Sequence, residues 1–309
     1  MKKLLTYTLT ITLLVFSEVS WAQMTAGKVT KKVREAYKEQ IKGIDDLTKR
    51  TNRGITFQKW IRGSGETIHK FRKEEDINGK TQITVYDGTY YRTKNPYTNE
   101  VTKKEIEGNP EVFYKYLESF DFEYAGRDKV NGIDCHVLIV ESVPLSEIKD
   151  PTTGDSMIPP DAEGMQDATV DAKLFIDSRR WVMVKSVFDA QGLQMQGRRR
   201  GARTVIVNKD FRNIEGLVIA YHTRMNMTID MTEEEKQKMK EARQSMRQMK
   251  ERMKNMSPAK RKMLEKYMKP EMQKAQSMMM NGGMSKEIKV QNVKINQGIS
   301  DDLFDGSSL

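Results

Sequence analysis

The chain has 309 residues, and its 53 Lys and Arg against 43 Asp and Glu give a formal net charge of +10 at pH 7. The single cysteine, Cys135, rules out an intramolecular disulfide, so the fold must be stabilised by a hydrophobic core. The length suffices for one large domain or two small ones and excludes a small disulfide-stapled scaffold.

The first residues have the pattern of a secretory signal peptide. Lys2 and Lys3 form a positive region, residues 4–16 are mostly apolar, and Ser20-Trp21-Ala22 places small residues where a signal peptidase reads. A membrane anchor is the alternative, but the apolar run is too short to span a bilayer comfortably. We therefore expect residues 1–22 to be removed, leaving a soluble periplasmic protein.

An amphipathic helix is predicted directly after the cleavage site. Apolar residues recur at steps of three and four among Lys and Glu, and Asn52-Arg53-Gly54 ends the pattern. The apolar positions are Val29, Val33, Tyr37, Ile41 and Ile44.

Antiparallel strands are predicted for most of the remaining chain. Tight-turn pairs such as Asn78-Gly79, Asp87-Gly88 and Asn131-Gly132 separate segments that alternate with period two, which is a strong hairpin signal. A short helix is expected after Asn109-Pro110, and a long surface loop over residues 144–169. The expected strands are 55–61, 67–73, 82–86, 90–92, 122–127, 133–140, 174–176, 181–188, 204–211, 217–227 and 288–295.

Several of these strands are apolar on both alternating sets of side chains. Cys135 and Val137 face one way in the strand 133–140, while His136 and Leu138 face the other. An antiparallel sheet with one wet face would instead alternate between apolar and polar residues. We therefore expect a curved sheet wrapped around a helix or an apolar ligand, with Cys135 as an inert core thiol.

The excess positive charge lies in one segment near the end of the chain. Residues 231–286 hold fifteen Lys and Arg against seven Glu and read as Met-rich helix between two strands. We therefore predict a β domain over residues 23–230 and 285–309, interrupted by a helical, basic, Met-rich insertion over residues 231–284.

Several segments resemble the LolA-like family of outer-membrane lipoprotein-sorting proteins. The resemblance covers roughly residues 25–230 and 285–305, and it consists of strand and turn patterns. It is carried by Asn131–Val137, Lys173–Asp177, Trp181–Lys185, Lys209–Val218, Val293–Asn296 and Ile299–Phe304.

The resemblance implies an α+β protein built on a curved, unclosed antiparallel half-barrel with a helical lid and an apolar concave side. Family members of known activity hold the acyl chains of lipoproteins in such a cavity in the periplasm, and some relatives are sensors. We expect a cavity for a lipoprotein acyl chain or a lipid. Strand alternation alone suggests as its lining Phe57, Ile61, Phe71, Val85, Val137, Val184 and Ile219.

The insertion has three interpretations. Its Met seam could pack on itself or over the sheet, or it could form an adaptable lid whose basic residues meet an anionic membrane surface or an envelope protein. The thioethers of Met278, Met279 and Met280 could instead bind Cu(I). The lid or partner face would comprise Met239, Met246, Met249, Met253, Met256, Arg243 and Arg247.

No catalytic motif is present in the sequence. It has neither a Gly-x-Ser-x-Gly elbow nor a His-Glu-x-x-His motif nor a glycine-rich phosphate loop, and its three His are scattered singly. The cluster of Arg198, Arg199, Arg200 and Arg203 is interpreted first as a solvated hairpin end, with contact to anionic headgroups or an acidic partner surface as the alternative. No aromatic-interleaved pattern indicates nucleic acid. We expect a non-catalytic carrier of an amphipathic ligand with no cofactor and no metal. The alternatives are an envelope interaction or sensor module and a Cu(I)-binding protein.

Overall fold

A computed structural model gives the structure of most of the chain. The predicted signal peptide, the turn at residues 63–65 and most of the predicted insertion lie outside the described residues. The described residues are 24–62, 68–77, 79–106, 113–118, 120–148, 167–195, 198–237 and 283–309, with residues 240, 241, 244, 248 and 251.

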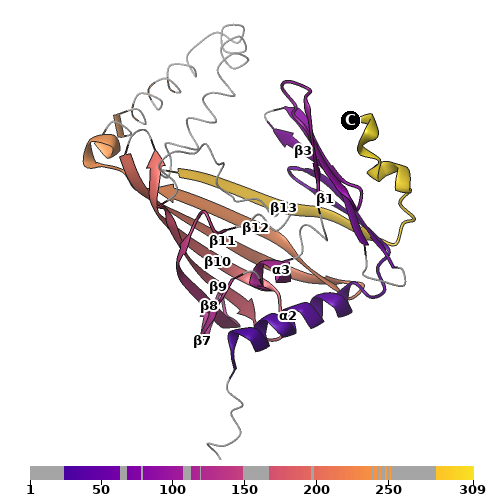
Figure 1. Cartoon of the computed structure of the whole chain (residues 1–309), viewed down its shortest axis with the longest axis horizontal. Coiled ribbons are helices and arrows are strands. Elements are labelled where there is room, and N and C mark those ends of the chain that lie inside the picture. The colour runs from indigo at the N-terminus through magenta and orange to yellow at the C-terminus, as the bar shows by residue number, and fades with distance from the viewer. Residues whose placement is uncertain are drawn as a thin grey trace, which may run out of the picture.

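The described strands form one thirteen-stranded antiparallel sheet in the order β6-β5-β4-β3-β2-β1-β13-β12-β11-β10-β9-β8-β7. The last strand, β13, pairs with both β1 and β12 and so joins two meanders. Because β6 and β7 remain as edges, the sheet is a curved, unclosed half-barrel, as predicted (Figure 1).

The strands of the first meander are β1 (Asp46–Thr51), β2 (Gly54–Ile61), β3 (Ile68–Ile77), β4 (Lys80–Tyr86), β5 (Tyr90–Lys94) and β6 (Val101–Glu105). Those of the second are β7 (Glu123–Val130), β8 (Ile133–Pro144), β9 (Thr169–Asp177), β10 (Met183–Met195), β11 (Arg198–Ile214) and β12 (Leu217–Ile229), followed by β13 (Gly283–Ile295).

Tight turns form where the sequence predicted them. Asn131 and Gly132 both have positive φ, at 51° and 81°, and so do Glu215 and Gly216, at 50° and 94°. Two successive positive φ values match the right-handed twist of the flanking strands. These turns therefore fix the register of β7 with β8 and of β11 with β12.

The helix α2 (Ala26–Gln40) is the predicted amphipathic helix, but it ends earlier than predicted. The side chain of Thr25 caps its N-terminus by accepting from the backbone N–H of Lys28. Ile41 is the C-cap, Gly43 follows, and the chain then enters β1, which the sequence pattern did not indicate. The short helix α3 (Phe113–Glu118) lies beside α2, and the Arg34 guanidinium contacts the Glu118 carboxylate at 2.8 Å.

We call the face of the sheet that packs against α2 the inner face and the opposite one the outer face. Val29 and Val33 of α2 are buried against Leu138, Leu174 and Ile176 of the inner face, together with Tyr114 and Leu117 of α3. A second inner-face cluster joins the end of α2 to the middle of the sheet and contains Ile41, Ile44, Leu47, Trp60 and Ile295.

The outer face of β7–β11 has an apolar cluster of its own, which confirms that these strands are apolar on both sides. Cys135, Val137, Phe175, Val184 and Val187 are all buried in it. Burial raises the pKa of the Cys135 thiol to about 11, with the charge of a nearby carboxylate adding to the effect. The thiol is therefore protonated and chemically quiet, as the sequence predicted.

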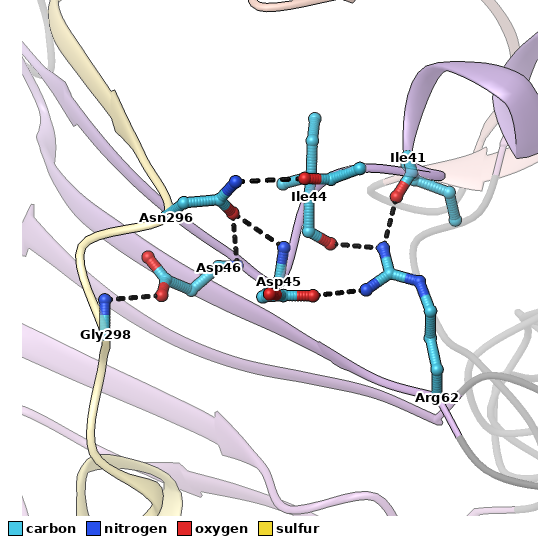
Figure 2. A network of polar contacts seen from close by, with 8 residues as sticks. Ile41, Ile44, Asp45, Asp46, Arg62, Asn296 and Gly298 are labelled. Atoms are coloured by element: carbon cyan, nitrogen blue, oxygen red, sulfur yellow. Dashed lines mark hydrogen bonds and ion pairs between the residues drawn. The ribbon is translucent and has the colours of Figure 1, made fainter.

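A polar junction ties α2, β1, β2 and the end of β13 together (Figure 2). The buried Asp46 carboxylate accepts hydrogen bonds from the backbone N–H groups of Gln297, Gly298 and Ile299 at 2.8, 2.8 and 3.2 Å. The Arg62 guanidinium donates to the carbonyl oxygens of Ile41 and Ile44, where α2 ends. A cation there complements the partial negative charge of the helix terminus.

The chain beyond β13 crosses the outer face of the first meander. It forms the 3₁₀ turns η1 (Asp301–Phe304) and η2 (Gly306–Ser308), which Figure 1 shows beside β1 and β3 on the side away from the second meander. The Asp301 carboxylate lies 3.3 Å from Lys59 Nζ and 3.5 Å from Lys70 Nζ. The side chain of Phe304 is buried. This segment therefore covers one face of β2 and β3.

Candidate ligand-binding face

An aromatic row lines the inner face of the first meander. Trp60 of β2 stacks on His69 of β3 with ring centroids 5.2 Å apart, and Phe71 packs against Tyr86 and Tyr91 at 5.9 Å each. Such offset and edge-on contacts stabilise beyond simple burial. The row is closed to solvent, because Trp60, His69, Phe71 and Tyr86 are at most 6% exposed.

The inner face of the second meander is equally closed where α2 crosses it. His136 is buried between Trp181, stacked at 5.1 Å, and Tyr124, whose hydroxyl lies 3.1 Å from Nδ1. Burial lowers the pKa of His136, and the positive charge of Arg127 adds to this effect. Among the described residues, this end of the inner face, which we call the closed end, is therefore packed core.

The opposite end of the inner face is apolar but only partly buried. Met225 pairs with Ile206, and Met227 pairs with Met284. Because paired residues share a face and residues two apart on a strand do too, all four lie on the face that carries Ile219. None of them belongs to a core cluster of the described residues. We call this set the apolar row and define it as Ile206, Met225, Met227, Ile229, Met284 and Ile288.

One member of the apolar row is openly exposed. Met284 shows 51% of its surface to solvent, which puts it among only three large hydrophobic residues of the described chain that are exposed, with Tyr97 and Val101. The other members are half-buried. Ile288 pairs with Thr223 of β12, so the row extends over six residues of that strand to Ile229 and is about 20 Å long.

The apolar row ends at an arginine that is mostly shielded from solvent. Arg200 lies two residues beyond Ala202, which pairs with Ile229, so strand alternation places Arg200 on the inner face. Its side chain is 12% exposed, and its guanidinium donates to both oxygens of Glu235, one of them at 3.0 Å. Its Nε has no hydrogen-bond partner among the described residues.

Glu235 belongs to a helical turn that begins the predicted insertion. The Thr232 hydroxyl accepts from the Glu235 N–H at 3.3 Å, and the Glu235 carboxylate accepts from the Thr232 N–H at 3.0 Å, which is a capping box. The hydrogen bond from Arg200 and the one from Thr232 hold the pKa of Glu235 below its usual value. In Figure 1 this turn follows β12 at the end of the strands opposite α2.

A hollow of about 470 Å³ adjoins this arginine. The hollow lies at the ends of β10, β11 and β12. Side chains of both the inner and the outer face line it, so it opens over the rim where these strands end. Arg198 and Arg199 on its wall are exposed, and Arg199 lies 2.7 Å from the Asp167 carboxylate. The rest of the wall comprises Gln191, Gly192, Arg200, Gly201, Asp230, Met231, Thr232 and Glu235.

One ion pair crosses the inner face between the two meanders. Lys286 of β13 lies 3.7 Å from the Glu75 carboxylate of β3, and Lys73 lies 3.1 Å from the same group. Burial alone would raise the pKa of Glu75, but Lys73 and then Lys286 outweigh it and lower the pKa.

A second hollow of about 340 Å³ lies between α2 and α3, with Phe120 and Phe122 beside Lys31 and Arg34.

The seven cavity residues suggested by the sequence do not share one surface. Phe71 and Ile219 lie on the inner face. Phe57 pairs with Arg72, which pairs with Val85, so Phe57, Val85 and Ile61 occupy the face opposite Phe71. Val137 and Val184 belong to the outer-face cluster of the second meander.

The residues proposed for the lid or partner face all lie outside the described residues. These are Met239, Met246, Met249, Met253, Met256, Arg243 and Arg247. The thioether run at residues 278–280 lies outside them as well.

The apolar row was missed because no strand pattern says which alternating set of side chains faces inward. The sequence offered one signal for it. Met225 and Met227 alternate with polar Arg224, Asn226 and Thr228, so this half of β12 reads as one-sided.

Comparisons with known proteins leave the function open. No protein-family model matches the chain, and no curated protein matches it. Among solved structures, a DUF1329 family protein from Desulfovibrio piger is similar at 12% identity and a TM-score of 0.47, over 92% of this chain and 97% of that one. Similarity at this level supports no statement about function, so the function is inferred from the geometry.

The part of the chain that the structure describes contains no helix long and apolar enough to cross a membrane.

Proposed function

We propose that this protein is a non-catalytic periplasmic binding protein that holds the apolar part of a lipid or a lipoprotein acyl chain against the open end of its inner face. The apolar row is the observation that carries this proposal. Its six side chains lie on the concave architecture of a half-barrel, and they stay outside the packed core. The pattern of residues 1–22 supports export to the periplasm.

The energetics favour a flexible apolar chain as the ligand. Each methylene that leaves water contributes about 0.8 kcal/mol, so contact along even part of a row about 20 Å long gives useful affinity. Methionine occupies three of the six positions of the apolar row, Met225, Met227 and Met284. Its unbranched side chain adapts to different partners, so these positions impose no fixed shape on the ligand. The ligand class is therefore set by apolarity and length more than by shape.

The closed end explains why only one end of the half-barrel is proposed to bind. Val29 and Val33 of α2 already occupy the inner face there, and the aromatic row fills the first meander. A ligand entering this region would have to displace core side chains, each of which stabilises the fold by a few kcal/mol. The open end requires no such displacement.

Displacement of a fluorescent fatty acid, together with mass spectrometry of lipids that co-purify with the periplasmic protein, tests the proposal. We expect saturable displacement by palmitate and a reproducible co-purified lipid. A Met227→Asp variant sets the background, because it places a charge in the middle of the apolar row. Wild-type protein that captures no more lipid than this variant would contradict the proposal.

A further inference from the structure

On the inner face, the apolar row lies next to a positively charged side chain, that of Arg200. The apolar row runs from Ile288 and Met225 to Met227 and Ile229, and Arg200 stands at its end. Lys286, which pairs with Met225 on the same face, is neutralised by the Glu75 carboxylate at 3.7 Å. An apolar strip that ends at a cation matches a molecule with a hydrocarbon tail and one anionic headgroup. The hollow of about 470 Å³ beside Arg200 provides the volume for such a headgroup.

The two terminal nitrogens of the Arg200 guanidinium are already paired with a carboxylate from elsewhere in the chain. Glu235 accepts two parallel hydrogen bonds from it, which is the geometry in which arginine recognises a carboxylate or a phosphate ligand. Glu235 reaches this position from the first turn after β12, outside the sheet. The structure therefore shows Arg200 donating to a carboxylate.

We propose that the ligand is an anionic amphiphile whose headgroup binds Arg200 in exchange for the Glu235 carboxylate, while its tail lies on the apolar row toward α2. This inference rests on the proposed function and adds the ligand's headgroup charge and its orientation. Glu235 then acts as a resident substitute for the headgroup, and binding releases the first turn of the insertion from the sheet.

The competition between Glu235 and the ligand has a direct consequence. Removing the charge of Glu235 frees Arg200 and strengthens binding of an anionic ligand. Gln at this position retains the capping box with Thr232, because either Glu or Gln can return the hydrogen bond to the cap residue. A variant that binds more tightly after losing a contact is not expected from a purely structural ion pair.

The experiment measures displacement of a fluorescent fatty acid by palmitate, by uncharged monopalmitoylglycerol and by inorganic phosphate, in full-length protein. For Arg200→Gln, we expect palmitate to bind about tenfold more weakly, as for loss of a charged hydrogen bond, with monopalmitoylglycerol unchanged. For Glu235→Gln, we expect palmitate to bind several-fold more tightly. Arg203→Gln is the matched control, because Arg203 is exposed and pairs with Asp189 at 3.3 Å. It should change neither ligand.

Each alternative has its own result. Equal losses for palmitate and monopalmitoylglycerol in Arg200→Gln, or no gain in Glu235→Gln, would overturn the headgroup assignment and leave the proposed function intact. Selectivity lost in Lys286→Gln but kept in Arg200→Gln would move the headgroup to Lys286 and overturn it as well. Displacement by phosphate as strong as by palmitate would reduce the site to a free-anion site. Absence of all lipid binding in the wild type would remove the proposed function with it.

Discussion

The two ends of the inner face belong to one continuous sheet, yet they differ in what covers them. At the closed end, α2 and the aromatic row bury Leu138, Trp60 and Phe71 almost completely. At the open end, the apolar row remains half-buried, and Met284 is more than half exposed. The helix is fifteen residues long, or about 22 Å, and covers only part of the strands.

The closed end and the open end of the inner face therefore have different roles. The closed end supplies stability, because its side chains are in contact with α2 and with one another. The open end supplies contact surface for a ligand, because its side chains have few partners within the described chain. Substitutions at the closed end should therefore change the free energy of unfolding, and substitutions at the open end should change ligand affinity.

The largest expected effect is at the closed end. Leu138→Ala removes a fully buried side chain from the cluster under α2 and should lower the free energy of unfolding by about 2–5 kcal/mol, measured by urea denaturation. Palmitate affinity of the folded fraction should not change. Met225→Ala is the comparison at the open end and should be markedly less destabilising. Lost palmitate binding in a fully folded Leu138→Ala protein would break the separation.

The polar junction behind the closed end comes next. Asp46→Ala leaves the N–H groups of Gln297, Gly298 and Ile299 without their acceptor, and each unsatisfied buried donor costs about 1–3 kcal/mol. We expect a loss of about 3 kcal/mol in the same urea assay. Asp45→Ala is the matched control, since the Asp45 carboxylate is exposed and forms a surface ion pair with Arg62; its loss should cost less than about 1 kcal/mol. Equal effects of the two variants would contradict this role of Asp46.

A charge on the apolar row should change binding with little effect on stability. Met227→Asp should weaken palmitate binding at least about tenfold, which corresponds to about 1.4 kcal/mol, while unfolding changes by less than about 1 kcal/mol. Thr228→Asp is the control, because its side chain is exposed and points to the other face of β12. A similar loss of binding in both variants would mean that the face of the strand does not matter.

The smallest expected effect is a pH dependence from His136. Because its pKa is lowered in the folded state, the unfolded chain binds a proton at a higher pH than the folded chain does. Stability is therefore full above the unfolded pKa of about 6.5 and falls as the pH drops through the folded pKa, by about 1.4 kcal/mol for each unit of depression. Urea denaturation between pH 7.5 and 5 should show a flatter slope for His136→Phe. Parallel slopes would assign the dependence to other groups.

Most of the sheet could be predicted from local signals. Asn131-Gly132 and Glu215-Gly216 adopt the positive φ values that their residue types favour, and the strands around them lie where alternation placed them. β6 was missed because Val101–Glu105 is a charged edge strand with no apolar alternation. β1 was missed because Ile41 and Ile44 continue the helical spacing of α2, although Gly43 gave a local signal for the helix end.

For the candidate site, the sequence predicted an apolar surface but not the residues that form it. Two-sided apolar strands correctly indicated that both faces of β8 are buried, but alternation within a strand does not reveal which set faces α2. Five of the seven suggested cavity residues consequently lie on the outer face or on the face opposite Phe71. The role of Arg200 depended on its partner Glu235, thirty-five residues away in the chain.

The sequence by itself determined most of the sheet's strands other than β1 and β6, its tight turns, its inert thiol and the presence of α2, because hydrogen-bonded turns and apolar periodicity are local properties of the chain. Only the tertiary structure decided which face is inner, how far α2 extends over it, and that Arg200 ends an apolar row. These features depend on register between strands such as β12 and β13, which are separated by more than fifty residues of sequence. Long-range pairing of that kind is set by how the whole core packs, and no local pattern records it.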